Sequence, residues 1–210
     1  MKACWIVLLV TSSTTVGLAQ TAATTGDSPA HFRWSERRAH ELSYQNTIRT
    51  SSDLTPDQRE AILNAVLGQL KRQKLEDVSP SGLRQLALNT RIEFADLNGD
   101  GSKEVIAQSK GGEACGGTGN CFLWVFQAAD EGYKLLFDSG GEVLRILSSS
   151  CGGYEDIAVG THDSAAERTL FVYAYSNGSY RRSRCYSLSW VSDNFERLEN
   201  PRIWPCKGGK

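Results

Sequence analysis

Apolar residues recur at helical spacing between Ile62 and Leu70, and this is the clearest periodic pattern in the chain. Just ahead of this run, Thr55 suits an N-cap, Pro56 the first helical position and Gln58 the capping-box position. Together these features predict a helix of roughly five turns from Pro56 to about Lys74. Since it carries a single apolar stripe, the helix has to pack on another element.

After a second, shorter helical turn that begins at Ser79 and Pro80, the pattern changes to short runs rich in β-branched and aromatic residues. Gly, Asn and Asp separate these runs, as is typical of turns between strands. The predicted strands are RIEFA, EVIAQS, CFLWVFQ, YKLLF, EVLRIL, DIAVGT, TLFVYAY and SYRRSRCYSLSW. FLWVF and LFVYA are apolar at almost every position, so we expect both strands to be covered on two faces.

The strand region contains a weak internal repeat. The stretch KEVIAQSKGG…CFLWVFQAADEGYKLLF aligns with EDIAVGTHDS…TLFVYAYSNGSYRRS, which places Tyr133 opposite Tyr180. Two similar antiparallel meanders of roughly propeller-blade length are the physical interpretation. We therefore predict an α+β fold for a single domain over residues 31–206, in which an N-terminal helix packs on these meanders.

The N-terminus, MKACWIVLLVTSSTTVGLAQ, has the pattern of a secretory signal peptide. Lys2 supplies the positive start, Trp5 to Val10 the apolar core, and a small-x-small site precedes cleavage near Ala19-Gln20. The apolar core is shorter than the roughly 20 residues that span a bilayer. We predict a signal peptide at 1–19, a disordered spacer at 20–30, a flexible tail at 207–210 and no membrane span, hence a secreted or periplasmic protein.

Composition and net charge limit the kinds of partner that we expect the chain to bind. The chain has 210 residues, 40% of them hydrophobic, and a formal net charge of -1. This is ordinary globular composition for one domain. A near-neutral balance gives no electrostatic footprint for nucleic acid. Another protein or a glycan is the expected kind of partner.

Cysteines are disulfide candidates in an exporting pathway. Cys115 and Cys121 flank the glycine-rich GGTGN loop, which can bring them within bonding distance, and they are the first predicted pair. Cys185 with Cys206 is the second predicted pair. Removal of Cys4 with the signal peptide makes the count odd, so Cys151 is expected to be left over as a buried thiol.

The most informative motif is DLNGDGSKE, residues 96–104. Calcium binds six to eight oxygens, and alternating side chains on a tight loop plus a backbone carbonyl can supply them. Gly101 allows the sharp turn, and the candidate ligands are Asp96, Asn98, Asp100, Ser102 and Glu104. The EF-hand position for a bidentate Glu is occupied by Ala107, which excludes an EF-hand. A tight hairpin turn alone also favours Asp, Asn and Gly, but crowded carboxylates without a counter-ion repel each other.

Over residues 91–109 the chain is predicted to form a strand, the motif D-x-N-x-D-G-x-x-E and a second strand. This order resembles an FG-GAP or VCBS-type repeat of integrin-like β-propellers. The resemblance places a degenerate second copy near 151–163, where the alternating carboxylates of the loop are lost. The resemblance implies a hairpin loop that binds calcium through Asp96, Asn98, Asp100, Ser102 and Glu104. A closed propeller needs about four to eight blades, and only two fit here, so we expect two blade-like meanders without closure.

Catalytic patterns are weak, and we expect no enzyme. His162, Asp163 and Ser164 are adjacent, whereas a catalytic triad draws its members from separate elements. The leading hypothesis is an exported, non-enzymatic binding module that calcium stabilises. The alternatives are a secreted or periplasmic enzyme inhibitor that presents the CGGTGNC loop, and a hydrolase whose site the spacing does not reveal.

Overall fold

The computed structural model describes residues 40–75 and 77–206. The predicted signal peptide at 1–19, the spacer at 20–30 and the tail at 207–210 lie outside the described residues, as does the start of the predicted domain at 31–39. Within the described chain the fold is β-rich, with two antiparallel sheets and two α-helices.

Both helices begin where the sequence predicts. Helix α1 (Pro56–Arg72) starts at the N-cap Thr55, whose side chain accepts a hydrogen bond from the Gln58 N–H while the Gln58 side chain accepts one from the Thr55 N–H. Helix α2 (Pro80–Leu88) starts at the N-cap Ser79. The description of α1 as an N-terminal helix needs correction, because strands β1 and β2 precede it and both helices lie between β2 and β3.

One sheet has five strands in the order β2-β3-β4-β5-β6, and every pairing in it is antiparallel. Because its last four strands are also consecutive in sequence, they form a meander. The short 3-10 turn η1 (Gly112–Ala114) lies between β4 and β5. The strands are β2 (Asn46–Thr47), β3 (Arg91–Ala95), β4 (Glu104–Gln108), β5 (Cys121–Ala129) and β6 (Gly132–Gly141).

The other sheet has six strands in the order β1-β7-β8-β9-β10-β11, again antiparallel throughout. β11 was not predicted, because RLENPRIWP alternates poorly and contains two prolines; proline is tolerated at the edge of a sheet, which is where β11 lies. The strands are β1 (His40–Glu41), β7 (Val143–Cys151), β8 (Tyr154–His162), β9 (Glu167–Ser176), β10 (Ser179–Val191) and β11 (Arg197–Pro205).

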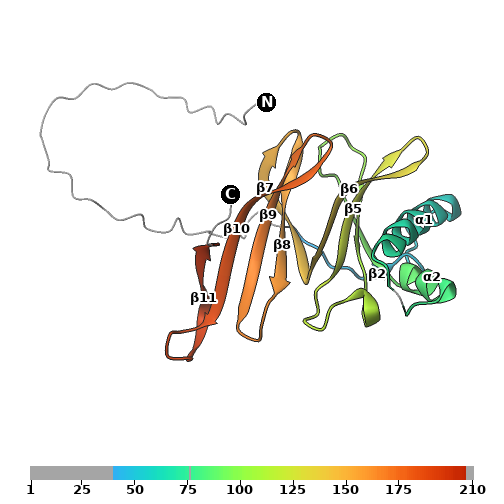
Figure 1. Cartoon of the computed structure of the whole chain (residues 1–210). Helices are drawn as coiled ribbons and strands as arrows, with labels where there is room; N and C mark the ends of the chain where they lie inside the picture. The colour runs from blue at the N-terminus through green and yellow to red at the C-terminus, as the bar shows by residue number, and fades with distance from the viewer. Residues whose placement is uncertain (1–39, 76, 207–210) are drawn as a thin grey trace, which may run out of the picture.

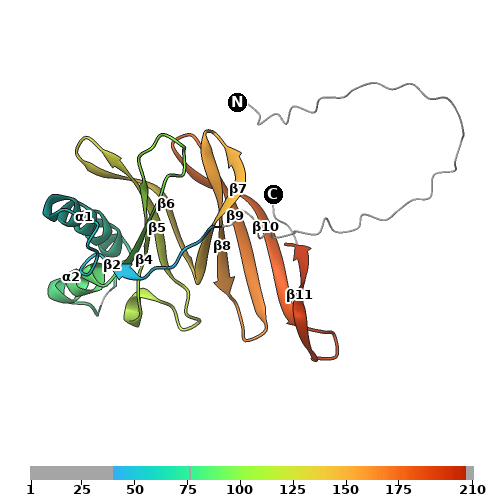
Figure 2. The same ribbon diagram turned by 180° about the vertical axis from the view of Figure 1, so that it is seen from behind.

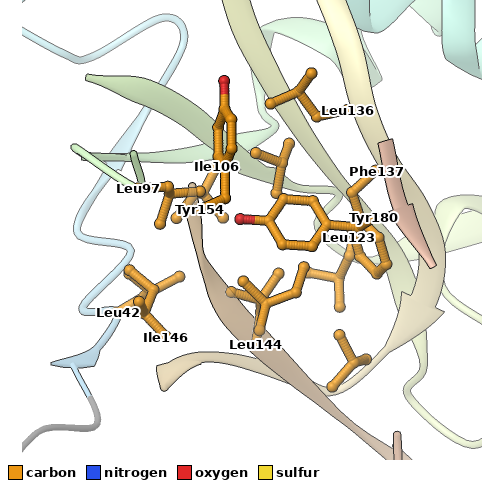
Figure 3. Close-up of a cluster of buried hydrophobic side chains, with 13 residues drawn as sticks. Leu42, Leu97, Ile106, Leu123, Leu136, Phe137, Leu144, Ile146, Tyr154 and Tyr180 are labelled. Atoms are coloured by element: carbon orange, nitrogen blue, oxygen red, sulfur yellow. The ribbon is translucent and has the colours of Figure 1, made fainter. Parts of the chain in front are cut away.

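The elements form three layers: the helices, then the five-stranded sheet, then the six-stranded sheet (Figure 1). The apolar stripe of α1 packs with Trp124 and Phe126 of the five-stranded sheet, which buries these aromatic side chains completely. The opposite face of this sheet meets the other sheet, and the cluster between them includes Leu123 and Leu144 (Figure 3). β5 is therefore covered on both faces, as its continuous apolar run predicts.

The first described residues cross between the sheets. β1 pairs with β7 and, five residues later, β2 pairs with β3, so one short segment closes the first edge of each meander. Figure 2 shows this segment running from the six-stranded sheet to β2. Leu42, which lies between the two short strands, is buried in the cluster that joins the sheets.

Two disulfides connect the pairs that the sequence favours, Cys115 with Cys121 and Cys185 with Cys206. The prediction for Cys151 is wrong, because this residue is disulfide-bonded too, and the described residues contain no free cysteine. Among the helices of the described ranges, none combines the length and the apolar composition needed to cross a bilayer.

Candidate functional site

The acidic loop, residues 96–103, connects β3 to β4 and is much longer than a hairpin requires. Ala95 pairs with Glu104, so eight residues lie between the paired positions. By contrast, the β5–β6, β7–β8 and β9–β10 hairpins each turn with two residues. Gly99 and Gly101 have φ values of 73° and 87°, which glycine adopts without strain.

Backbone N–H groups hold the side chains of the acidic loop over its own turn. The Asp96 carboxylate accepts hydrogen bonds from the N–H groups of Gly99 (2.8 Å) and Gly101 (2.9 Å). Asn98 Oδ1 accepts from the Asp100 N–H, and Asp100 Oδ1 accepts from the Ser102 N–H. These Asx-type bonds explain the residue types at 96, 98 and 100. The Ser102 N–H, together with the Asn98 amide, lowers the pKa of the exposed Asp100 carboxyl.

Glu104 differs from the other acidic residues because it is buried, with 1% of its surface exposed. Its carboxylate accepts a hydrogen bond of 2.8 Å from the Leu97 N–H. Burial raises the pKa of Glu104; the Leu97 N–H opposes this rise, and the neighbouring charges of Asp100 and Asp96 add to it. No ion pair joins Glu104 to another described residue.

The predicted calcium ligands share one loop but do not form a ready metal site. Ser102 is exposed, and Glu104 lies at the start of β4 beneath the loop. Within residues 40–75 and 77–206, no three Asp, Glu, His or Cys side chains are grouped so that they could hold a metal ion. Carboxylate and amide oxygens are the right chemistry for calcium, but the acidic loop would have to draw them closer together. Calcium binding stays a prediction.

The acidic loop also contacts the six-stranded sheet. The Leu97 carbonyl accepts a 2.7 Å hydrogen bond from the Glu155 N–H, and the Leu97 side chain is buried between the sheets (Figure 3). Asn98 Nδ2 donates to the Tyr154 hydroxyl at 3.2 Å, and Gln127 donates to the same oxygen at 2.7 Å. The sequence did not reveal Tyr154, because no local pattern connects it with a loop that lies more than fifty residues away.

The loop from Cys115 to Cys121 holds the other end of β8. The Asn120 side chain donates to the His162 carbonyl at 2.9 Å and accepts from the His162 N–H at 2.8 Å, as a neighbouring strand would. The disulfide and a Gly116 N–H to Asn120 carbonyl hydrogen bond close this loop. Loops of one sheet thus fix both ends of a strand in the other.

The adjacent His162, Asp163 and Ser164 form hydrogen bonds that shape the local chain. The Asp163 carboxylate accepts hydrogen bonds from the hydroxyls of Thr161 and Thr169. Ser164 Oγ accepts from backbone N–H groups of the following turn. Since these bonds shape the turn before β9, the three residues have a structural explanation.

Comparisons with known protein families, with curated proteins and with solved structures give no match for this chain. The resemblance of residues 91–109 to an FG-GAP or VCBS-type repeat therefore stays a prediction. Any functional argument has to come from the geometry of the acidic loop, of the disulfide loop and of the surfaces around them.

Proposed function

We propose that the protein is an exported, non-enzymatic binding module whose acidic loop takes up calcium. The observation that carries this proposal is Glu104, a buried carboxylate that forms no ion pair among the described residues and lies close to two further carboxylates. A buried charge without a counter-charge is costly. A calcium ion would remove this cost with the oxygen ligands that it prefers.

Calcium would act on the structure rather than on a reaction. The acidic loop connects the two sheets through Leu97 and Asn98. An ion held by Asp96, Asp100 and Glu104 would restrict this loop and so strengthen the connection. The proposed role is to stabilise a binding module in a compartment where calcium is plentiful.

Export rests on two lines of support. The described residues contain disulfides, which form and persist in oxidising compartments. The predicted signal peptide at 1–19 is the second line. The proposed relation to extracellular propeller-type repeats would need antiparallel meanders, and each sheet contains a run of consecutive antiparallel strands.

Thermal unfolding of the exported protein in EDTA and then in millimolar calcium tests the proposal. At 100 times the dissociation constant, calcium adds about 2.7 kcal/mol of stability, which for a chain of this length raises the melting temperature by several degrees. Asp100→Ala should abolish the rise. Asp130→Ala, in the exposed β5–β6 turn, is the matched control and should keep it. Equal melting with and without calcium would contradict the proposal.

A second candidate, an enzyme inhibitor, is favoured by the disulfide loop. Residues 116–119 are exposed, while the disulfide and the Asn120 contacts hold their ends. A loop that is rigid before binding loses less entropy when it enters an active site. Assays against a panel of secreted proteases and glycoside hydrolases test this idea. Inhibition should disappear when Cys115 and Cys121 are both replaced by Ser, and a panel without any inhibition would exclude this candidate.

A further inference from the structure

A cavity of about 420 Å³ lies beside the acidic loop, at the start of α1. Its walls come from four separate segments. Asp53, Leu54 and Gln58 lie at or just before the first turn of α1, Phe94 lies near the end of β3, Lys103 ends the acidic loop, and Tyr133 lies near the start of β6. Cavities of 300–1,000 Å³ with a few polar groups are typical of small-ligand sites.

Several polar groups around this cavity are not used within the described protein. Lys103 forms no ion pair with any described residue. The Tyr133 hydroxyl has no hydrogen-bond partner among the described residues. Gln58 uses only its side-chain oxygen in the capping box, which leaves its two amide N–H donors for another acceptor.

The apolar wall of the cavity consists of two aromatic residues and a leucine that pack in the core beneath α1. Phe94 and Tyr133 pack against the cluster beneath α1, and Leu54 belongs to that cluster. Aromatic side chains offer a large apolar surface, and tyrosine adds a polar tip. The site therefore combines an apolar surface with hydrogen-bonding groups that come from several directions.

The charges around the cavity balance, and this limits the ligand. Asp53 supplies one carboxylate and Lys103 one ammonium group. An anionic ligand would face Asp53 and a cationic one would face Lys103, and like charges brought together at an interface weaken binding. A ligand with neutral hydroxyl groups avoids both penalties, since each hydroxyl can donate to the carboxylate and accept from the ammonium group.

We propose that this cavity binds a neutral pyranose unit of a glycan. A pyranose ring has apolar C–H faces for Phe94 and Tyr133 and a rim of hydroxyls for Asp53, Gln58 and Lys103. The inference rests on the proposed function, since it names the ligand class of the binding module, but it does not depend on calcium. Lys103 is the part of the acidic loop that would contact the sugar.

NMR titration of the exported protein with neutral oligosaccharides tests this site. The probes are the tetrasaccharides of β-1,4-linked glucose, of α-1,4-linked glucose and of β-1,4-linked N-acetylglucosamine. At least one should shift the backbone amide signals of Lys103 and Tyr133 and the side-chain amide signal of Gln58. Tyr133→Ala and Lys103→Met should each weaken binding by about tenfold, a change equivalent to one good contact.

Two matched controls are available outside the cavity: Lys110→Met, at an exposed lysine after β4, and Phe195→Ala, at an aromatic residue that is 87% exposed. Both should bind like the wild type, and thermal unfolding should show that all four variants are folded. Absence of binding for every probe, or equal weakening in the controls, would overturn the proposed site.

The titrations are run in EDTA and in calcium, and the sugars are then analysed by mass spectrometry. Binding in both solutions without a calcium-dependent melting shift supports the pocket and contradicts only the calcium proposal. Cleavage of a bound sugar supports the pocket and contradicts the proposed non-enzymatic function. A calcium-dependent melting shift without sugar binding overturns the pocket alone.

Discussion

The β3–β4 and β7–β8 hairpins occupy equivalent places in the two meanders but are built differently. The β7–β8 hairpin turns at Gly152 and Gly153, whose φ values are 63° and 85°, and it needs no acidic residue. The β3–β4 hairpin uses the eight residues of the acidic loop. Two glycines are therefore enough to reverse the chain at this position.

The difference shows what the extra length of the acidic loop contributes. The acidic loop inserts Leu97 between the sheets and reaches Tyr154, the first residue of β8 after the glycine turn. The short turn instead lets the chain pass close to its neighbours: a Cβ atom at Gly152 would lie 2.8 Å from the Tyr175 carbonyl oxygen. The β3–β4 hairpin joins the two sheets, whereas the β7–β8 hairpin allows a close approach to β9 within its own sheet.

Of the changes that test this comparison, replacing Leu97 with Ala should cause the largest loss of folding stability. Leu97 is 1% exposed in the cluster between the sheets, and Leu→Ala changes at such sites cost about 3 kcal/mol or more. Urea denaturation monitored by tryptophan fluorescence measures the loss. A cost below about 1 kcal/mol, the size expected at a site with little packing, would show that the acidic loop does not hold the sheets together.

Replacing Gly152 with Ala should cost less, about 2–3 kcal/mol, because left-handed φ strain of 1–2 kcal/mol adds to the clash with the Tyr175 carbonyl. Gly153→Ala is the matched control. Its φ is also positive, but nothing lies within 4 Å of its added Cβ atom, so only the φ strain of about 1–2 kcal/mol remains. Equal losses in the two variants would contradict the close approach.

The smallest expected effect is on the pH dependence of folding stability, to which the buried carboxylate of Glu104 contributes. The pKa of Glu104 is raised by burial, so the folded state binds its proton more tightly than the unfolded state does. In EDTA this residue should stabilise the fold at acid pH, and the gain should fade as pH rises through the folded pKa. Glu104→Gln, which keeps an acceptor for the Leu97 N–H, should remove that component.

Chemical denaturation of the two proteins between pH 4 and pH 7 measures the difference. Parallel stability curves would show that Glu104 titrates normally. In saturating calcium the trend should reverse, because the ion binds the deprotonated carboxylate. Wild-type stability should then rise with pH relative to Glu104→Gln.

Local signals in the sequence were sufficient for the helices and for most strands. Thr55, Pro56 and Gln58 determine the start of α1 through contacts only three residues apart, and alternating or continuous apolar runs mark β3 to β10. β1 and β2 are two residues long, too short for any periodic pattern. The disulfide at Cys151 was missed because the prediction assumed that one cysteine would remain after loss of Cys4.

The site was harder to predict because its contacts connect distant parts of the chain. Asp96, Asn98 and Asp100 form the Asx-type hydrogen bonds that these residue types favour in turns, while their predicted calcium binding stays a prediction. Nothing near Asn98 indicates Tyr154, and nothing near Asn120 indicates His162. Likewise, Lys103 and Tyr133 become neighbours of one cavity only when α1, β3 and β6 are assembled.

The short segment that carries β1 and β2 has a consequence for handling the protein. A fragment that begins after Thr47 would lose both strands at once and leave unpaired backbone groups along β3 and β7. Such bare edges are templates for association between chains. The edge at β11 has its own protection, since Pro201 and Pro205 interrupt the row of donors there. Trimming the N-terminus past Thr47 should therefore favour aggregation over a smaller soluble domain.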